Sequence, residues 1–208
     1  MDKLCSHAAV FLILAIGNAV LVTAGDPDLL KDFVVPLGLD PTTITSQYFT
    51  FTGFRALREA NLTGRTTALV TKATLKEFSA LEGQGVSVAA IMYPPSGMNP
   101  PHVHPRASEL LIVLLGSLEV GFVDTTNKLY TQTLQAPDMF VFPKGLVHFQ
   151  VNTKTDSPCI ALGILGSANA GTVLLPSTLF GSGISADILA KAFKTDEQTI
   201  NKLIEANK

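Results

Sequence analysis

The chain has 208 residues, of which 47% are hydrophobic and 15% are charged, and its formal net charge is −2. This composition is too apolar and too weakly charged for an intrinsically disordered chain. It also lacks the concentrated positive charge that nucleic-acid binding requires, so no nucleic-acid partner is expected. The length suits one domain with a large core, and the 16 Gly and 12 Pro indicate many turns between short strands.

The amino end has the pattern of a secretory signal peptide. An almost uncharged run spans 8–24, and Val22-Thr23-Ala24 supplies small residues at the spacing that signal peptidase prefers. The alternative is a membrane anchor, but the run is short for a bilayer span and has no flanking stop-transfer charges. We therefore predict that residues 1–24 are a signal peptide, and we expect no membrane association after its removal.

Residues 25–65 predict an extended N-terminal arm, because this stretch is irregular and rich in turn-forming residues. Within it, Asn61-Leu62-Thr63 is an acceptor motif for N-glycosylation, which behind a signal peptide predicts a glycan at Asn61 on a surface loop. After cleavage Cys159 would be the only cysteine, so the secreted chain could form no internal disulfide. Cys159 precedes an apolar strand and is interpreted as a buried thiol rather than a nucleophile.

Residues 66–175 predict a β-sandwich or barrel. Short β-branched or alternating runs are separated there by Gly, Pro, Asn and Asp, without a helical pattern between them. The predicted strands are 68–74, 86–93, 110–115, 118–123, 129–134, 139–142, 149–153 and 160–165.

Residues 176–208 change to a helical period and predict two short amphipathic helices. Ser185 and Thr195 are the predicted N-caps, the second forming a capping box with Gln198. Little of the barrel core is left for these helices to cover. They are expected either to fold back on the barrel or to clasp a neighbouring subunit.

Two segments of the predicted barrel carry candidate metal ligands. His102 and His104 are two residues apart, a spacing that places both imidazoles on one face of a strand. Pro105 and the residues after it supply a bend that would return Glu109 to the same point, and His148 adds a third imidazole if its strand lies beside the first. Three imidazoles and one carboxylate leave open positions on a metal ion, as in a catalytic site. The alternative is that these histidines are simply packed or solvated.

At these residues the sequence resembles the germin and germin-like proteins, secreted plant members of the cupin superfamily. The family's first box, HxHPxAxE, is matched by 102–109, and its second box, PxGxxHxxxN, by 143–152. The resemblance implies an all-β fold, a cupin β-barrel of the jelly-roll type, with manganese held by His102, His104, Glu109 and His148. It also implies C-terminal helices that interlock dimers, a homohexamer of three dimers, and a location in the apoplast or cell wall.

Two departures from the family pattern bear on stability and activity. Many germins carry a cysteine pair in the N-terminal arm, and its absence here means that packing or a neighbour must hold the arm. Members that oxidise oxalate place two asparagines over the metal. Asn99 matches one of them, but the second position is Ala89, which cannot hydrogen-bond a carboxylate substrate. Asn99 could instead be a turn residue before Pro100.

Two functions from different classes are therefore expected, and a third function is a weaker alternative. The first is superoxide dismutation to hydrogen peroxide and oxygen at a manganese site, with Asn99 orienting water or a small anionic substrate, and with a role in defence or in the cell wall. The second is a non-catalytic extracellular binding or storage protein whose metal is mainly structural. Oxalate oxidation is the weaker enzymatic alternative. The ligand types alone do not identify the metal, since manganese is the weakest binder of the divalent series. The resemblance to the germin family favours manganese.

Overall fold

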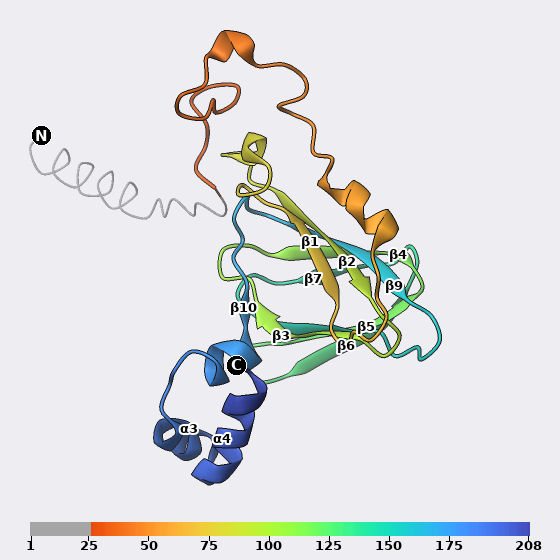
Figure 1. Ribbon diagram of the computed structural model, residues 1–208, viewed down its shortest axis with the longest axis vertical. Helices are drawn as coiled ribbons and strands as arrows, with labels where there is room; N and C mark the ends of the chain where they lie inside the picture. Colours follow the sequence, from red (N-terminus) through yellow and green to blue (C-terminus); the bar gives the residue numbers. More distant parts are fainter. Residues whose placement is uncertain (1–25) are drawn as a thin grey trace, which may run out of the picture.

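Two five-stranded antiparallel sheets face one another in the computed structural model, which describes residues 26–208 (Figure 1). The first sheet has the order β1 (Leu69–Ala73), β2 (Ser87–Tyr93), β9 (Cys159–Leu165), β4 (Glu109–Leu115), β7 (Met139–Phe142). The second has the order β10 (Val173–Leu174), β3 (Met98–Val103), β8 (Val147–Val151), β5 (Ser117–Val123), β6 (Leu129–Gln135). This arrangement confirms the predicted all-β jelly-roll barrel.

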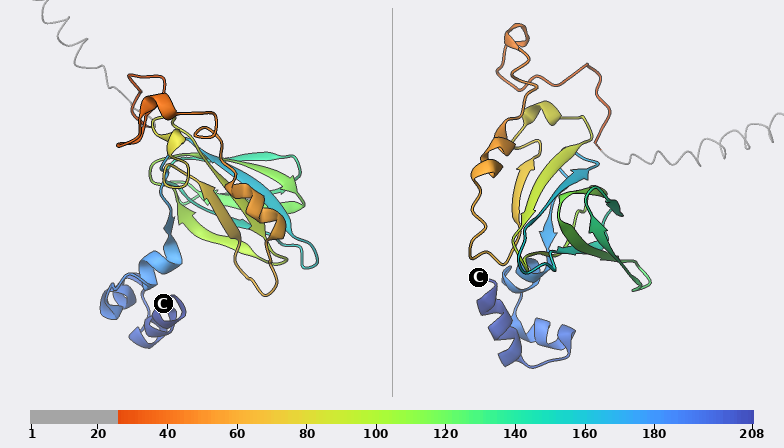
Figure 2. Two further views of the ribbon diagram at one scale, coloured as in Figure 1. Left: turned by 45° about the horizontal axis from the view of Figure 1, so that its top comes forward. Right: turned by 90° about the vertical axis from the view of Figure 1, so that its right-hand side faces the viewer.

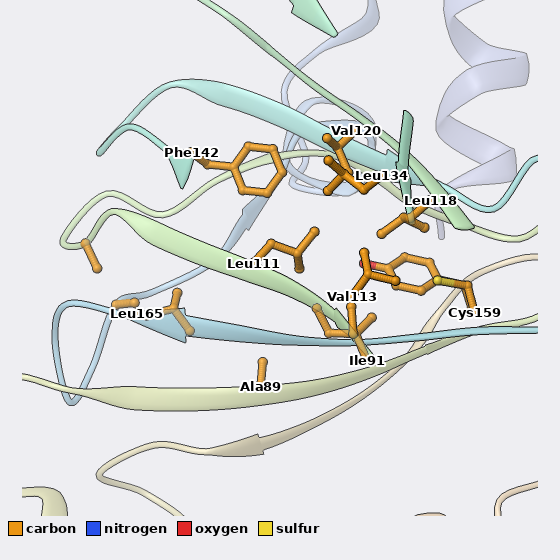
Figure 3. Packing of buried hydrophobic residues seen from close by; sticks show 14 residues of the cluster. Ala89, Ile91, Leu111, Val113, Leu118, Val120, Leu134, Phe142, Cys159 and Leu165 are labelled. Atoms are coloured by element: carbon orange, nitrogen blue, oxygen red, sulfur yellow. The ribbon is translucent and has the colours of Figure 1, made fainter. Parts of the chain in front are cut away.

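Alternation of buried and more exposed residues, which is clearest in β9, explains why these segments form a two-layered barrel. Along β9 every second side chain from Cys159 to Leu165 is buried, and such a period of two places those side chains on one face of the sheet. The inward residues of both layers form one apolar cluster, in which Leu111 and Val113 of β4 point toward Leu118 and Val120 of β5 (Figure 3). The core thus lies between the two sheets.

The eight predicted strands are all present, and most of their ends differ by no more than one residue from the prediction. The largest difference is in β8, which begins and ends two residues before the predicted 149–153. The sequence did not predict β3, because Pro100 and Pro101 cannot donate ladder hydrogen bonds. The structure accommodates them through a register irregularity between Asn99 and His102 in the pairing of β3 with β8.

The C-terminal region forms three helices: α2 (Leu175–Phe180), α3 (Ala186–Phe193) and α4 (Glu197–Ala206). They extend away from one end of the barrel beyond β10 (Figure 1). Ser185 is the N-cap residue of α3, as predicted. The prediction of Thr195 as the N-cap of the last helix was wrong. Asp196 takes that position, where its carboxylate accepts a hydrogen bond from the Thr199 amide at 2.8 Å, because a charged oxygen is the stronger cap.

The first part of the described chain is an arm that runs along the outside of the barrel. It contains two short 3-10 helices, η1 (Pro41–Thr43) and η2 (Gly53–Glu59), and η2 lies beside β1 (Figure 2); a third, η3 (Ser79–Leu81), follows β1. The Asp26 carboxylate anchors the start of the arm by accepting hydrogen bonds from the Ser167 hydroxyl at 2.6 Å and the Ala168 amide at 2.7 Å. The predicted signal peptide, 1–24, lies outside the described residues.

The predicted glycosylation site is exposed. Asn61 lies on the surface of the arm, and its side-chain oxygen accepts a hydrogen bond from the Thr63 amide at 2.9 Å. Within 26–208, no helix has the length and apolar character needed to cross a bilayer. Cys159 is buried at the start of β9, and burial raises the pKa of its thiol to about 11, which agrees with the interpretation as an unreactive core thiol.

Candidate metal centre

Three segments of the barrel bring His102, His104, Glu109 and His148 together. β3 carries His102 and ends one residue before His104, and a turn then leads to Glu109 at the start of β4. β8 lies beside β3 and places His148 opposite His102 in register. One potential ligand atom from each of the four side chains lies within 4.8 Å of all the others. The structure therefore joins the four residues that the two sequence segments predicted.

A backbone carbonyl orients each imidazole. The Nδ1 atom of His102 lies 2.8 Å from the Pro100 oxygen, that of His104 lies 2.6 Å from the Gly171 oxygen, and that of His148 lies 2.9 Å from the Leu146 oxygen. A carbonyl can only accept, so each ring donates from Nδ1 and keeps Nε2 as a free lone pair. The three Nε2 atoms are therefore available to a metal ion.

The Glu109 carboxylate completes the cluster. Its Oε2 atom lies 3.0 Å from His104 Nε2 and 3.5 Å from His148 Nε2. Burial alone would raise the pKa of Glu109, but the imidazoles of His104 and His148 beside its carboxylate outweigh this effect and lower the pKa to about 2. Burial, with a smaller contribution from His148, lowers the pKa of His102 to about 4. At neutral pH the cluster thus offers a carboxylate and a neutral His102 imidazole, the protonation states that metal binding requires.

Two buried atoms of this cluster have no hydrogen-bonding partner among the described residues: His148 Nε2 and Glu109 Oε1. Buried polar atoms are almost always paired, so such atoms point to a missing partner. A divalent cation bound by three imidazoles and a carboxylate supplies one, and it would retain open positions for water or substrate. The residues therefore fit a bound divalent metal ion.

A cavity of about 880 Å³ connects the cluster with the exterior. Asn99, His102, His104 and Glu109 line it, and the Asn99 amide nitrogen lies 3.4 Å from His102 Nε2. The predicted Asn99 is therefore at the site, whereas Ala89 contributes only a methyl group to the same cavity. Just over half of the other lining residues are apolar, and they come from β1, β2, β3, β9, β10 and the segments beside these strands.

Sequence reasoning did not identify the lysines of the cavity. Lys144, in the turn before His148, is exposed and does not line the cavity. Lys72 and Lys76 do line it, and Lys72 Nζ donates a hydrogen bond to Thr172 Oγ1 at 3.3 Å. Val70 and Lys72 are two residues apart on β1 and both line the cavity, so this spacing was the signal that could have identified Lys72.

Sequence reasoning also missed the segment that orients His104. Gly171, whose carbonyl accepts from this imidazole, belongs to a loop held by Arg106. The Arg106 guanidinium donates from Nε to the Asn169 carbonyl at 2.6 Å and from Nη2 to the Asn169 side-chain oxygen at 2.9 Å. This pair of hydrogen bonds fixes the loop, so Arg106 acts on the cluster indirectly.

Fold and site together define a cupin barrel that could hold a metal ion, and the family described as Cupin matches residues 54–201. The chain is 53% identical over 205 residues to germin-like protein 9-3 of Oryza sativa subsp. japonica, covering 96% of this chain and 95% of that protein. Putative germin-like protein 9-2 of the same organism is also 53% identical, over 200 residues, covering 95% and 93%. The chain therefore belongs to the germin-like proteins of the cupin superfamily.

Solved structures of oxalate oxidase have the same fold. One of them superimposes with a TM-score of 0.80 at 32% identity, covering 88% of this chain and 98% of the oxalate oxidase chain. A complex of oxalate oxidase with the substrate analogue glycolate gives a TM-score of 0.77 at 31% identity, with the same coverage of 88% and 98%.

Proposed function

We propose that this germin-like protein binds manganese through His102, His104, Glu109 and His148 and dismutates superoxide to hydrogen peroxide and oxygen in the plant apoplast. The observation that carries the proposal is the convergence of three imidazoles and one carboxylate at the base of an open cavity. The mixed nitrogen and oxygen donor set fits a divalent cation without identifying it. The resemblance of 102–109 and 143–152 to the two germin boxes is what favours manganese.

In the reaction, two superoxide ions and two protons give one hydrogen peroxide and one oxygen molecule. The bound metal supplies the one-electron exchange. The chain's own residues do the rest: the Nδ1 hydrogen bonds hold the imidazoles in place, and the Asn99 amide is positioned to donate to an anion beside His102. The ammonium of Lys72 at the cavity wall raises the local concentration of anions.

The alternative is a non-catalytic extracellular binding or storage protein that keeps its metal for structure. The volume of about 880 Å³ and the apolar residues in the walls of the cavity favour this function, since both suit a small organic ligand. Oxalate oxidation is the weaker enzymatic alternative. The solved oxalate oxidase structures support it, but Ala89 leaves one side of the cavity without a hydrogen-bond donor for a carboxylate.

The proposal also covers the location of the protein. Residues 1–24 act as a signal peptide that is removed during secretion, and the mature protein resides in the apoplast or cell wall. There it carries a glycan at Asn61 and has a role in defence or in the cell wall. We also propose a homohexamer built as a trimer of dimers, in which α3 and α4 contact a neighbour. Three large apolar side chains on these helices are exposed and would be covered in such an assembly: Ile188, Phe193 and Leu203. Light scattering on the secreted protein tests this assembly, and a monomer at micromolar concentration would contradict it.

Turnover assays on secreted protein distinguish the functions. Superoxide loss and oxalate-dependent peroxide release are measured on one sample as purified, after chelation, and after manganese is restored. The proposal predicts superoxide loss that disappears on chelation and returns with manganese, and no peroxide from oxalate. Stoichiometric metal without either activity would favour the binding protein, and oxalate turnover would favour the oxidase.

A further inference from the structure

One buried amide lies beside the metal cluster without belonging to it. Gln150 on β8 is fully buried, and neither polar atom of its side chain has a hydrogen-bonding partner among residues 26–208. An unpaired buried amide carries a desolvation cost, so native interiors pair nearly all such groups. Gln150 follows His148 by two residues on the same face of β8, so its partner should lie next to the cluster.

The strand pairing shows which side chains flank Gln150. Its direct neighbour on β5 is Val120, which offers no polar group. The next inward residue along β8 is Asn152, whose side-chain nitrogen already donates to two backbone carbonyls and whose oxygen accepts from a backbone amide. Both hydrogens of the Asn152 amide are therefore taken. These two neighbours leave the Gln150 amide without a partner.

Asn99 is the direct neighbour of Gln150 on the other side. The two residues lie opposite each other in the pairing of β3 with β8, next to the pair formed by His102 and His148. Directly opposite residues of an antiparallel pair share a face of the sheet, with Cβ atoms about 4.5–5.5 Å apart, so two amides there can meet. Among residues 26–208 the Asn99 side chain has one hydrogen bond, from its nitrogen to His102 Nε2, and its length of 3.4 Å exceeds the usual range of about 2.7–3.2 Å.

A metal ion and the Asn99 amide compete for the same lone pair. His102 donates from Nδ1 to the Pro100 carbonyl, so its Nε2 atom has one lone pair, which points either at Asn99 or at a metal. When a metal takes this lone pair, the Asn99 nitrogen needs another acceptor. The unpaired oxygen of Gln150 is available across the strand pair, and two facing primary amides can form two hydrogen bonds, because each has a donor and an acceptor.

We propose that Gln150 is a positioning residue that pairs with the Asn99 amide once a metal occupies His102 Nε2, and that it thereby holds one Asn99 N–H toward an anion bound at the metal. The pairing uses the Asn99 oxygen and one of its two N–H groups, so only the second N–H remains to face the cavity that Asn99 lines. Without Gln150, Asn99 could equally present its oxygen, which repels an anion. Gln150 does not line the cavity itself. The inference rests on the metal site of the proposed function and concerns how that site selects anions.

A double-mutant cycle on azide binding to the manganese-loaded protein tests this role. Gln150→Met, Asn99→Ala and the double variant are compared, with Gln132→Met as the matched control because Gln132 is exposed on β6. Asn99→Ala should weaken azide binding about tenfold, as expected for the loss of one hydrogen bond to an anion. Gln150→Met should weaken it nearly as much, and the double variant should bind no more weakly than Asn99→Ala, because Gln150 acts through Asn99. Wild-type azide affinity in Gln150→Met, or a further loss in the double variant, would overturn the proposal.

Two further measurements separate this role from a structural one. Gln150 makes no hydrogen bond to the four proposed ligands, so Gln150→Met should keep the wild-type manganese affinity. In metal-free protein Asn99 stays on His102 and the Gln150 amide is unpaired, so its replacement by methionine should not lower Tm. A lower Tm with unchanged azide affinity would assign Gln150 a purely structural role and overturn the proposal.

The same samples distinguish this inference from the proposed function. Wild-type protein that binds manganese and shows the coupled azide affinities, but does not consume superoxide, would contradict the proposed function and support the role of Gln150. A wild-type chain that binds no divalent cation would overturn both.

Discussion

Gly163→Ala tests how the structure makes room for the Glu109 carboxylate. A Cβ at position 163 would lie 2.5 Å from Glu109 Oε1 and 3.1 Å from its Cδ, whereas an ordinary contact is 3.4–4 Å. To regain 3.4 Å, Oε1 must retreat by about 0.9 Å, several times the tolerance of about 0.2 Å for a metal–ligand distance. The carboxylate is the mobile end of a flexible side chain, so we expect the fold to survive and the ligand to be displaced.

The expected result is a loss of manganese affinity of about 10- to 100-fold, as for other changes that misplace a metal ligand. Isothermal titration of metal-free protein measures it, and thermal unfolding of the same samples checks that Tm changes little. Gly166→Ala is the matched control, because its added Cβ would meet only Ser108 Oγ, at 3.7 Å. Wild-type manganese affinity in Gly163→Ala would refute the assignment of Glu109 as a ligand held in this orientation.

Three further predictions concern the groups around the cluster. Arg106→Lys keeps the charge but loses the paired hydrogen bonds to the loop that orients His104, so manganese titration should show about tenfold weaker binding; unchanged affinity would contradict this role. Lys72→Met should weaken azide binding to the metal-loaded protein about fivefold at low salt, with Lys144→Met unchanged; equal effects would remove Lys72 from the site. In metal-free protein the folded-state pKa of about 4 for His102 lies below its ordinary 6.5, so the unfolded state binds more protons between these values. The free energy of unfolding should therefore fall as pH drops from about 6.5 to 4, and His102→Gln should flatten this slope in urea titrations.

The candidate site was predictable because its signals are local. His102 and His104 share a strand face through a spacing of two, and a proline-containing bend returns Glu109 to the same point. The sequence predicted His148 as a ligand only if its strand lies beside the strand of His102. The pairing of β8 with β3, in which His148 lies opposite His102, meets this condition. The strands were predictable for the same reason, because the alternation of apolar and polar residues that indicates a strand is visible within a few consecutive residues.

The contacts that tune the site were not predictable because they join distant parts of the chain. The orientation of His104 depends on the Gly171 carbonyl, 67 residues away in sequence. The Glu109 carboxylate fits only because Gly163 on the neighbouring strand has no side chain. No local pattern marks either pairing. β3 was missed for a different reason: its prolines oppose strand formation, and tertiary pairing with β8 overrides that preference.

Elemental analysis of secreted protein, with the Glu109→Gln variant purified in parallel, tests the central claim most directly. Glu109→Gln keeps the size of the side chain but removes its charge, so the fold should persist while the ligand weakens. The account predicts one manganese ion per wild-type chain and less than about a tenth of that in the variant. Well-folded wild-type protein without metal, or equal metal in both proteins, would show that His102, His104, Glu109 and His148 do not form a metal centre.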